Sequence, residues 1–404
     1  MEAVDSGYDF SHVHASLDKY VEDDLLAMAA AVVLDGQAVV DFHMVGHQDR
    51  EKERLIQADS IYRIYSSTKL ITSCAAMMLW EEGKFGLDDP LQAYLPELGS
   101  LKVLKDGAGD ADSIEPVKNE PTVRQLMCHN AGFSYGLFAE SVVDPLYTEV
   151  GVSAPTSTLA DMVRKLADIP LAYQPGQRWQ YSVSADVLGR LIEVLSGQRF
   201  GEFLSRRIFE PLGMLDTGFH VPTEKRDRFC ANYAPVNMLD PMHPGLNVVP
   251  DTLVGDYLEP KPMESGGGGL VSTLGDYTRF IQMIVGGGML DDVRVLDPET
   301  LDMMRTNQLP EGVGVQLPNW FMPDTVFGLG FAIKTAPRPG EGERAIGEYH
   351  WGGMAGTHSW MSPESGISGI VFTQRLPGFW HPFSHDFKRL VYQATAPLHS
   401  KVGE

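Results

Sequence analysis

Ser66 and Lys69 lie three residues apart at the start of an apolar stretch. From position 70 to position 80 only Thr72 and Ser73 are polar, which predicts a central helix that is buried on all sides. Side chains three residues apart lie on one side of a helix, so the hydroxyl and the amine can meet. A serine hydroxyl needs a neighbouring base to take its proton, and a lysine can be that base where burial favours its neutral amine. The pair therefore indicates nucleophilic catalysis.

The spacing alone does not identify a site, because a chain of this length should hold about one such pair by chance. A second pair, Ser16 with Lys19, is indeed present. Around it Val13 and Leu17 recur at a helical interval, which is typical of an amphipathic surface helix. We interpret that pair as surface residues, since only Ser66 precedes an apolar helix.

Another candidate nucleophile is Ser134, because residues 132–136, GFSYG, match the GxSxG pattern of α/β-hydrolases. That pattern works as a sharp turn between a buried strand and a helix. Here the preceding residues 122–130, TVRQLMCHN, are helical in character, and a loop-like stretch follows. We therefore do not interpret Ser134 as the nucleophile, and we predict that Tyr135 lies at the substrate pocket.

The composition describes a soluble globular protein, with 43% hydrophobic and 21% charged residues. The net charge of −22 argues against nucleic acid or an anionic membrane as a partner. No apolar run approaches the roughly 20 residues that cross a bilayer, and the N-terminus lacks the features of a secretory signal. We therefore expect a cytoplasmic protein, and the sequence makes no prediction of its oligomeric state.

The cysteines and histidines do not form a metal-binding pattern. The three cysteines show no CxxC spacing, and Cys74 lies within the predicted buried helix as a small apolar residue. Two close histidine pairs, His12 with His14 and His381 with His385, have no evident third ligand. We therefore predict no metal site, and nothing in the sequence implies an organic cofactor.

The order of the predicted elements indicates an α+β fold. A hairpin at Asp35-Gly36 starts an antiparallel sheet, and four strand-like segments between positions 327 and 375 return to it. Gly83 is placed to end the central helix, residues 105–120 form a surface loop, and residues 122–250 are mainly helical. The glycines at 266–269 indicate close backbone approach before a helix that is capped near Ser272 or Thr273.

We predict a sheet domain from residues 1–92 and 255–404, a mainly helical domain from residues 93–254, and an active-site cleft between them.

Three widely spaced motifs resemble the ordered elements of the serine β-lactamase and penicillin-binding-protein superfamily. They are Ser66-Ser67-Thr68-Lys69, Tyr181-Ser182-Val183 and His350-Trp351-Gly352-Gly353. More narrowly, the chain is similar to the class C β-lactamase-like carboxylesterases called family VIII and to related acyltransferases, over most of positions 25 to 375. The resemblance implies the β-lactamase/penicillin-binding-protein (transpeptidase-like) fold, with an antiparallel sheet flanked by helices.

The resemblance also implies roles for single residues. Ser66 would be the nucleophile, Lys69 its partner, and Tyr181 the general base that later acts as general acid. A phenol with a reference pKa of about 10 ionises near neutral pH only beside a cation, which Lys69 would supply. The backbone N–H groups of Ser66 and Met354 would form the oxyanion hole.

Two departures from the superfamily pattern concern specificity. Val183 stands where the peptidases and lactamases usually have an asparagine that binds an amide. In the third motif either His350 or Trp351 could align with the usual lysine or histidine. Both changes favour an uncharged ester over a β-lactam.

We therefore predict that Tyr135, His350, Trp351, Gly352 and Gly353 bind substrate. Five aromatic residues are candidates for an apolar cleft: Tyr135, Trp179, Trp320, Trp351 and Trp360.

The leading hypothesis is a serine carboxylesterase that hydrolyses short-chain acyl esters through an acyl-enzyme on Ser66, with a small-molecule ester as its substrate and neither nucleic acid nor a membrane as a partner. One alternative is an acyltransferase or weak β-lactamase on the same scaffold. Another is a penicillin-recognising module that binds without catalysis.

Overall fold

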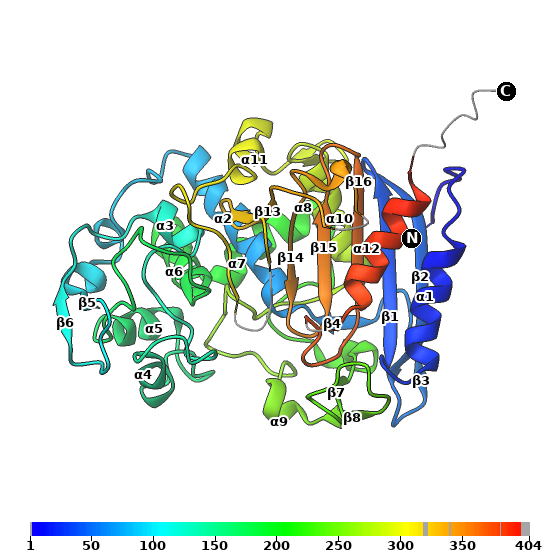
Figure 1. Cartoon of the computed structure of the whole chain (residues 1–404), viewed down its shortest axis with the longest axis horizontal. Helices are drawn as coiled ribbons and strands as arrows, with labels where there is room; N and C mark the ends of the chain where they lie inside the picture. The colour runs from blue at the N-terminus through cyan, green and yellow to red at the C-terminus, as the bar shows by residue number, and fades with distance from the viewer. Residues whose placement is uncertain (1, 318–321, 339–340, 380, 397–404) are drawn as a thin grey trace.

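An eight-stranded antiparallel sheet forms the centre of the computed structural model, which describes residues 2–317, 322–338, 341–379 and 381–396. The strand order is β12-β13-β14-β15-β16-β1-β2-β3, so strands from both ends of the chain lie side by side, blue beside orange in Figure 1. The bounds are β1 (Met28–Asp35), β2 (Ala38–Asp49), β3 (Arg54–Leu55), β12 (Thr325–Phe327), β13 (Ala332–Lys334), β14 (Tyr349–Gly353), β15 (Thr357–Met361) and β16 (Ile367–Phe372).

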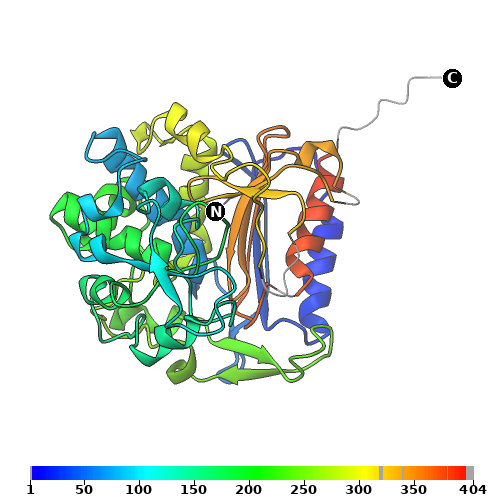
Figure 2. The same ribbon diagram turned by 60° about the vertical axis from the view of Figure 1, so that its left-hand side comes forward.

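The predicted hairpin at Asp35-Gly36 is confirmed, and Gly36 has the positive φ of 55° that such a tight turn requires. Both faces of the sheet are covered. Helices α1 (Ser11–Glu22) and α12 (Phe383–Ala394) pack on one face, and α10 (Leu274–Val285) packs on the other. Figure 2 shows α1 and α12 as the blue and red helices on one side of the sheet. Strand β1 is therefore buried along nearly its whole length.

The central helix is confirmed as α2 (Thr68–Glu81), and every residue from Thr68 to Leu79 is buried. It ends as predicted at Gly83, whose φ of 67° lets the N–H of Gly83 bond to Trp80 and that of Lys84 bond to Leu79. Ser66 precedes the α-helix in a short 3-10 turn, η1 (Tyr65–Ser67). Just before it, β4 (Ile61–Arg63) pairs with β9 (Val271–Thr273).

In the middle of the chain, at the left in Figure 1, most of the regular elements are helices. Its longer helices are α5 (Leu159–Leu166) and α6 (Ser184–Ser196), and α6 packs on α2. The shorter elements are η2 (Leu91–Ala93), η3 (Pro96–Ser100), α3 (Val123–Met127), α4 (Asp144–Glu149), α7 (Phe200–Leu204), the π-helix η4 (Ser205–Phe209), α8 (Glu210–Leu212), η5 (Thr223–Arg228) and α9 (Asp251–Val254).

Two short hairpins correct the sequence prediction. Strands β5 (Lys102–Leu104) and β6 (Ile114–Pro116) pair across the predicted surface loop, and β7 (Asn232–Pro235) pairs with β8 (Leu246–Val249) inside the stretch predicted to be helical. These strands are three or four residues long, too short to show a period of two in the sequence.

The glycines at 266–269 allow the close backbone approach that the sequence predicts. A Cβ on Gly266 would lie 2.4 Å from the carbonyl oxygen of Ala185, and one on Gly267 would lie 2.5 Å from a carboxylate oxygen of Asp186. Helix α10 then starts at the predicted cap Thr273, whose hydroxyl accepts the N–H of Asp276. The remaining elements are β10 (Met289–Leu290), β11 (Val293–Arg294), α11 (Pro298–Met304) and η6 (Glu343–Ala345).

The division into domains at positions 92 and 254 stays a prediction. One buried apolar cluster contains residues of both predicted parts, for example Leu70 and Ile71 of α2 with Leu188 and Leu191 of α6. None of the described helices combines the length and the hydropathy that a membrane crossing requires.

Candidate active site

Ser66, Lys69 and Tyr181 come together in the structure, although Tyr181 lies 115 residues from Ser66 in the chain. The Tyr181 hydroxyl donates a hydrogen bond to Ser66 Oγ at 2.7 Å, and Lys69 Nζ donates to the same oxygen at 3.2 Å. Lys69 Nζ also lies 4.7 Å from the centre of the Tyr181 ring. One hydroxyl is thus in hydrogen-bond contact with two groups that can exchange protons with it.

The turn that carries Ser66 is anchored on both sides. Tyr65 has a φ of 41°, a left-handed backbone conformation that is unfavourable for a residue other than glycine. Its phenol oxygen accepts a hydrogen bond from Asn232 at 3.2 Å, and Ser67 Oγ donates to the carbonyl of Thr357 at 2.9 Å. These contacts hold the unfavourable turn, which leaves Ser66 half-buried at the cavity surface.

Lys69 is only 3% exposed, so groups of the protein take the place of the water that would surround an exposed lysine amine. Its ammonium donates to the carbonyl of Gly267, and the rings of Tyr135 and Tyr181 lie within cation–π distance. Burial, and then the charge of Lys69, lower the pKa of nearby His129 well below its usual value. His129 is therefore neutral at physiological pH.

Tyr181 is held by a set of aromatic rings. Tyr135 stacks on it with ring centres 5.3 Å apart, Trp351 lies at 5.4 Å and Trp179 at 6.2 Å. Burial, and then the neighbouring Tyr181, raise the pKa of Tyr135 well above its usual value, so Tyr135 stays protonated. The rings fix the direction of the Tyr181 hydroxyl toward Ser66.

Strand β14 contains His350 and Trp351, the two residues that could align with the usual lysine or histidine of the third motif. His350 and Trp351 are neighbours on a strand, so their side chains point to opposite faces. Trp351 lies against Tyr181, on the face of Ser66. His350 lies on the face of α12, where burial, and then Lys388 and Lys334, lower its pKa well below its usual value. Of the two, Trp351 therefore occupies the position beside Ser66.

The end of β14 approaches the Ser66 turn closely. A Cβ on Gly353 would lie 2.3 Å from the carbonyl oxygen of Ile64 and 2.3 Å from Thr357 Oγ1, so only glycine fits there. Thr357 Oγ1 itself donates to the Ile64 carbonyl at 2.9 Å. Met354 is the next residue after Gly353 and therefore lies close to the turn that carries Ser66. Met354 and Ser66 both line the cavity.

The cavity beside Ser66 has a volume of about 670 Å³. Apolar side chains form much of its wall, among them Leu137, Phe138, Met238, Leu253, Leu317 and Met322. Of the predicted cleft aromatics, Tyr135, Trp351 and Trp360 line it, whereas Trp179 lies against Tyr181 and is not among the described lining residues. Trp320 lies outside the described residues.

Ser134 has a different environment. It is buried, its hydroxyl donates to Asp144 and accepts a hydrogen bond from Gln180 at 2.8 Å, and its backbone N–H donates to Tyr147. The described residues that line the cavity do not include Ser134. Its contacts are those of a buried polar residue that stabilises the loop.

Asp186 also belongs to the site, although it stands in none of the three sequence motifs. This buried residue of α6 accepts hydrogen bonds from the Gly267 N–H at 3.0 Å and the Ser265 hydroxyl at 2.5 Å. The carbonyl of the same Gly267 accepts from Lys69. Asp186 therefore positions the loop that holds the ammonium. An aspartate five residues after Tyr181, together with the glycines at 266–269, was the available signal.

We expect Asp186→Ala to lower kcat about 100-fold, because the Gly267 carbonyl loses its anchor and Lys69 shifts relative to Ser66. The measurement is kcat and KM for 4-nitrophenyl butyrate together with the melting temperature. Asp276→Ala is the matched control, since Asp276 is also a buried carboxylate that accepts a backbone N–H and a hydroxyl. Equal losses of kcat in the two variants would contradict a positioning role.

Comparison with known proteins identifies the family of the chain. Residues 13–392 match the Beta-lactamase family. Esterase EstB of Burkholderia gladioli is 30% identical over 90% of this chain and 90% of its own length. Protein Rv1367c of Mycobacterium tuberculosis (strain ATCC 25618 / H37Rv) is 31% identical over 90% of this chain and 89% of its own.

Among solved structures, EstCE1, described as a hydrolase with promiscuous acyltransferase activity, superposes with a TM-score of 0.79. It shares 22% identity over 94% of this chain and 97% of its own, a likeness of fold. The match over nearly the whole chain and a relative that is 30% identical over 90% of it together show that this protein belongs to the beta-lactamase family.

Proposed function

We propose that this protein hydrolyses carboxylic esters through an acyl-enzyme formed on Ser66. The observation that carries the proposal is the contact of Ser66 Oγ with both Tyr181 and Lys69 at the wall of a mostly apolar cavity. The family relationship to an esterase supports it.

In the first half of the reaction, the Tyr181 oxygen takes the proton of Ser66 as Oγ attacks the ester carbonyl. The positive charge of Lys69 stabilises the phenolate that this requires. Tyr181 then gives the proton to the departing alcohol oxygen as the carbon–oxygen bond breaks. In the second half, Tyr181 takes a proton from water, the water oxygen attacks the acyl carbon, and the proton returns to Ser66 as the acid leaves.

The carbonyl oxygen becomes negatively charged in each tetrahedral state. We propose that the backbone N–H groups of Ser66 and Met354 bind it, because the close approach of Gly353 to Ile64 brings the two segments together. Each such donor is worth about 3 kcal/mol in the transition state. Trp351 and Tyr135 would form the wall against which the substrate lies.

An ester is favoured over a β-lactam because the second motif lacks an amide group. Val183 is fully buried at the N-cap position before α6, and its aliphatic side chain offers no hydrogen bond to a substrate amide. We therefore expect nitrocefin turnover to be weak or absent. Short acyl chains are the proposed first substrates, although the cavity volume leaves room for larger groups.

A transfer reaction is the second candidate, since EstCE1 has this fold and is described as having acyltransferase activity. An alcohol in place of water would then take the acyl group from Ser66.

We expect a fluorophosphonate probe to add one covalent label to the wild-type protein, located on Ser66 by peptide mass spectrometry. A rate profile across 4-nitrophenyl esters of increasing acyl length, with and without an added alcohol, would separate hydrolysis from transfer. If the intact protein gains no mass from the probe, the proposal of a covalent intermediate fails.

A further inference from the structure

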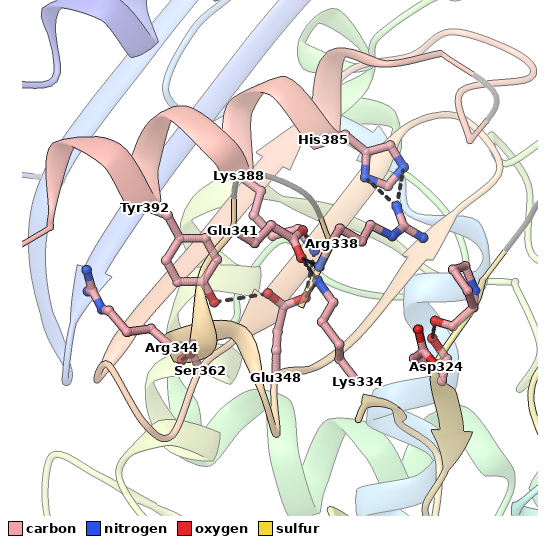
Figure 3. Close-up of polar contacts among 12 residues, drawn as sticks. Asp324, Lys334, Arg338, Glu341, Arg344, Glu348, Ser362, His385, Lys388 and Tyr392 are labelled. Atoms are coloured by element: carbon pink, nitrogen blue, oxygen red, sulfur yellow. Dashed lines mark hydrogen bonds and ion pairs between the residues drawn. The ribbon is translucent and has the colours of Figure 1, made fainter. Parts of the chain in front are cut away.

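The cavity continues beyond Ser66 to the other face of β14. Within the described residues, β13 pairs with β14 only at Ala332 with His350 and at Ile333 with Tyr349. The following residues 351–353 therefore form a sheet edge without a β13 partner, and the cavity is lined by residues from both sides of this edge. On the α12 side its wall includes Lys334, Arg338, His350, His358, His385 and Lys388. Figure 3 shows Lys334, Arg338, His385 and Lys388 of this set.

The charge of this wall is opposite to that of the protein. The chain has a net charge of −22, yet no aspartate or glutamate is among the described residues that line the cavity. The lining residues do include three cationic side chains, those of Lys334, Arg338 and Lys388. A wall lined by cations and imidazoles, and by no carboxylate, favours a negatively charged ligand.

The acids of this region lie behind the lysines. Lys334 donates to Glu341 at 2.5 Å, and Lys388 donates to Glu348 at 2.6 Å, with longer contacts across the two pairs. Burial alone would raise the pKa of Glu348, but Lys388 and Lys334 hold it below its usual value. The four charges therefore cancel, and the Arg338 guanidinium adds a positive charge at the wall (Figure 3).

Neutral imidazoles complete the wall. Arg338 Nη1 lies 3.3 Å from His385 Nδ1, so the guanidinium donates to the ring. Burial, and then Lys388 and Arg338, lower the pKa of His385 to about 4. A neutral imidazole can still donate one N–H to an acceptor. Lys388 and Arg338 disfavour a positive charge on the His385 ring, and for the same reason they would favour an anion beside it.

From this wall we propose that the far end of the cavity binds a carboxylate carried by the substrate, so that the preferred esters are those with a free acid group away from the reacting carbonyl. The inference rests on the proposed esterase function. Guanidinium and imidazole N–H groups suit a carboxylate, because both donate in a plane and the guanidinium can form two parallel bonds. The part of the substrate beside Trp351 would be uncharged, and the carboxylate would lie at the other end of the substrate.

The acid group could belong to the acyl part or to the alcohol part, so the experiment has two arms. The first compares monoethyl esters of straight-chain dicarboxylic acids, over a series of lengths, with ethyl esters of monocarboxylic acids of matched length. The second compares butyrate esters of ω-hydroxy acids with butyrate esters of simple alcohols. We expect the acid-bearing ester of one arm, at its best length, to have a kcat/KM about 10- to 100-fold above its neutral match.

Arg338→Gln should reduce that preference at least several-fold. Arg389→Gln is the matched control, because Arg389 is a cation on the same helix as Lys388 that pairs with Asp386 and is not among the described lining residues. The control should keep the wild-type preference ratio. An equal change of the ratio in both variants would overturn the assignment to this wall.

Binding separates this inference from the proposed chemistry. Calorimetric titration of the best half-ester onto the Ser66→Ala protein needs no turnover, and we expect it to bind at least tenfold more tightly than its neutral match. If this binding preference is found while the wild type hydrolyses no ester, the proposed function fails and the carboxylate site stands. If hydrolysis is found without any preference in rate or binding, the carboxylate site is wrong.

Discussion

Ser66→Ala is expected to lower kcat for 4-nitrophenyl butyrate by about five to six orders of magnitude, to the level of background hydrolysis. The variant keeps the cavity, the backbone N–H groups proposed to bind the oxyanion and the Tyr181–Lys69 pair, but it has no side-chain oxygen to form the proposed acyl-enzyme. Truncating a small side chain that is half-buried at the cavity surface leaves no large internal void, so the melting temperature should change by only a few degrees. The measurement is steady-state hydrolysis with active-site titration of the wild type.

Ser134→Ala is the control, because the two serines are the two candidate nucleophiles. It removes the hydrogen bonds to Asp144 and Gln180 and should lower stability by about 1–3 kcal/mol. Most of the kcat should remain, since Ser134 is not among the described cavity-lining residues. Should Ser134→Ala abolish turnover in a folded protein while Ser66→Ala retains it, the assignment of the nucleophile is wrong.

Tyr181→Phe is expected to lower kcat about 1,000-fold, the range of a lost general acid–base group. The ring keeps its contacts with Tyr135, Trp179 and Trp351, so the cavity wall and KM should change little. What is lost is the oxygen 2.7 Å from Ser66 Oγ. In the proposed mechanism this oxygen alternately takes and gives the proton. Burst-phase kinetics would show whether acylation, deacylation or both become slow.

Tyr147→Phe is the matched control for Tyr181→Phe. Tyr147 is also a buried tyrosine, and its hydroxyl accepts a hydrogen bond from the Ser134 N–H at 2.9 Å, so it has no proposed part in the chemistry of Ser66. Its loss should reduce stability and spare kcat. If both variants lose activity to the same degree, the effect of Tyr181→Phe reflects general damage to the fold, and another group must transfer the proton.

The sequence predicts the elements whose signals are local and strong. Helix α2 was found because apolar residues continue through several turns, and its end was found because Gly83 can adopt a positive φ. The β1–β2 hairpin follows from Asp35-Gly36 between apolar runs. The β7–β8 hairpin was missed, because its two short strands are separated by a long connection and carry no clear alternation.

The site residues likewise divide into those that a local pattern predicts and those that only distant contacts bring together. Ser66 and Lys69 are neighbours on one turn, so their contact can be derived from the helical spacing. Tyr181 was placed with them through the resemblance to a family, because no local pattern connects residues so far apart. The role of Asp186 and the wall around Arg338 were not foreseen, since each depends on contacts between segments distant in the chain.

The sequence by itself therefore determined the nucleophile motif, the helix that carries it and the α+β arrangement, because these depend on residue periodicity and turn chemistry. Only the tertiary structure decided which way the β14 side chains face, what holds the Lys69 ammonium and how charge is distributed around the cavity. Those features arise where strands, loops and helices from separate parts of the chain pack together, and packing of this kind leaves no local pattern in the sequence.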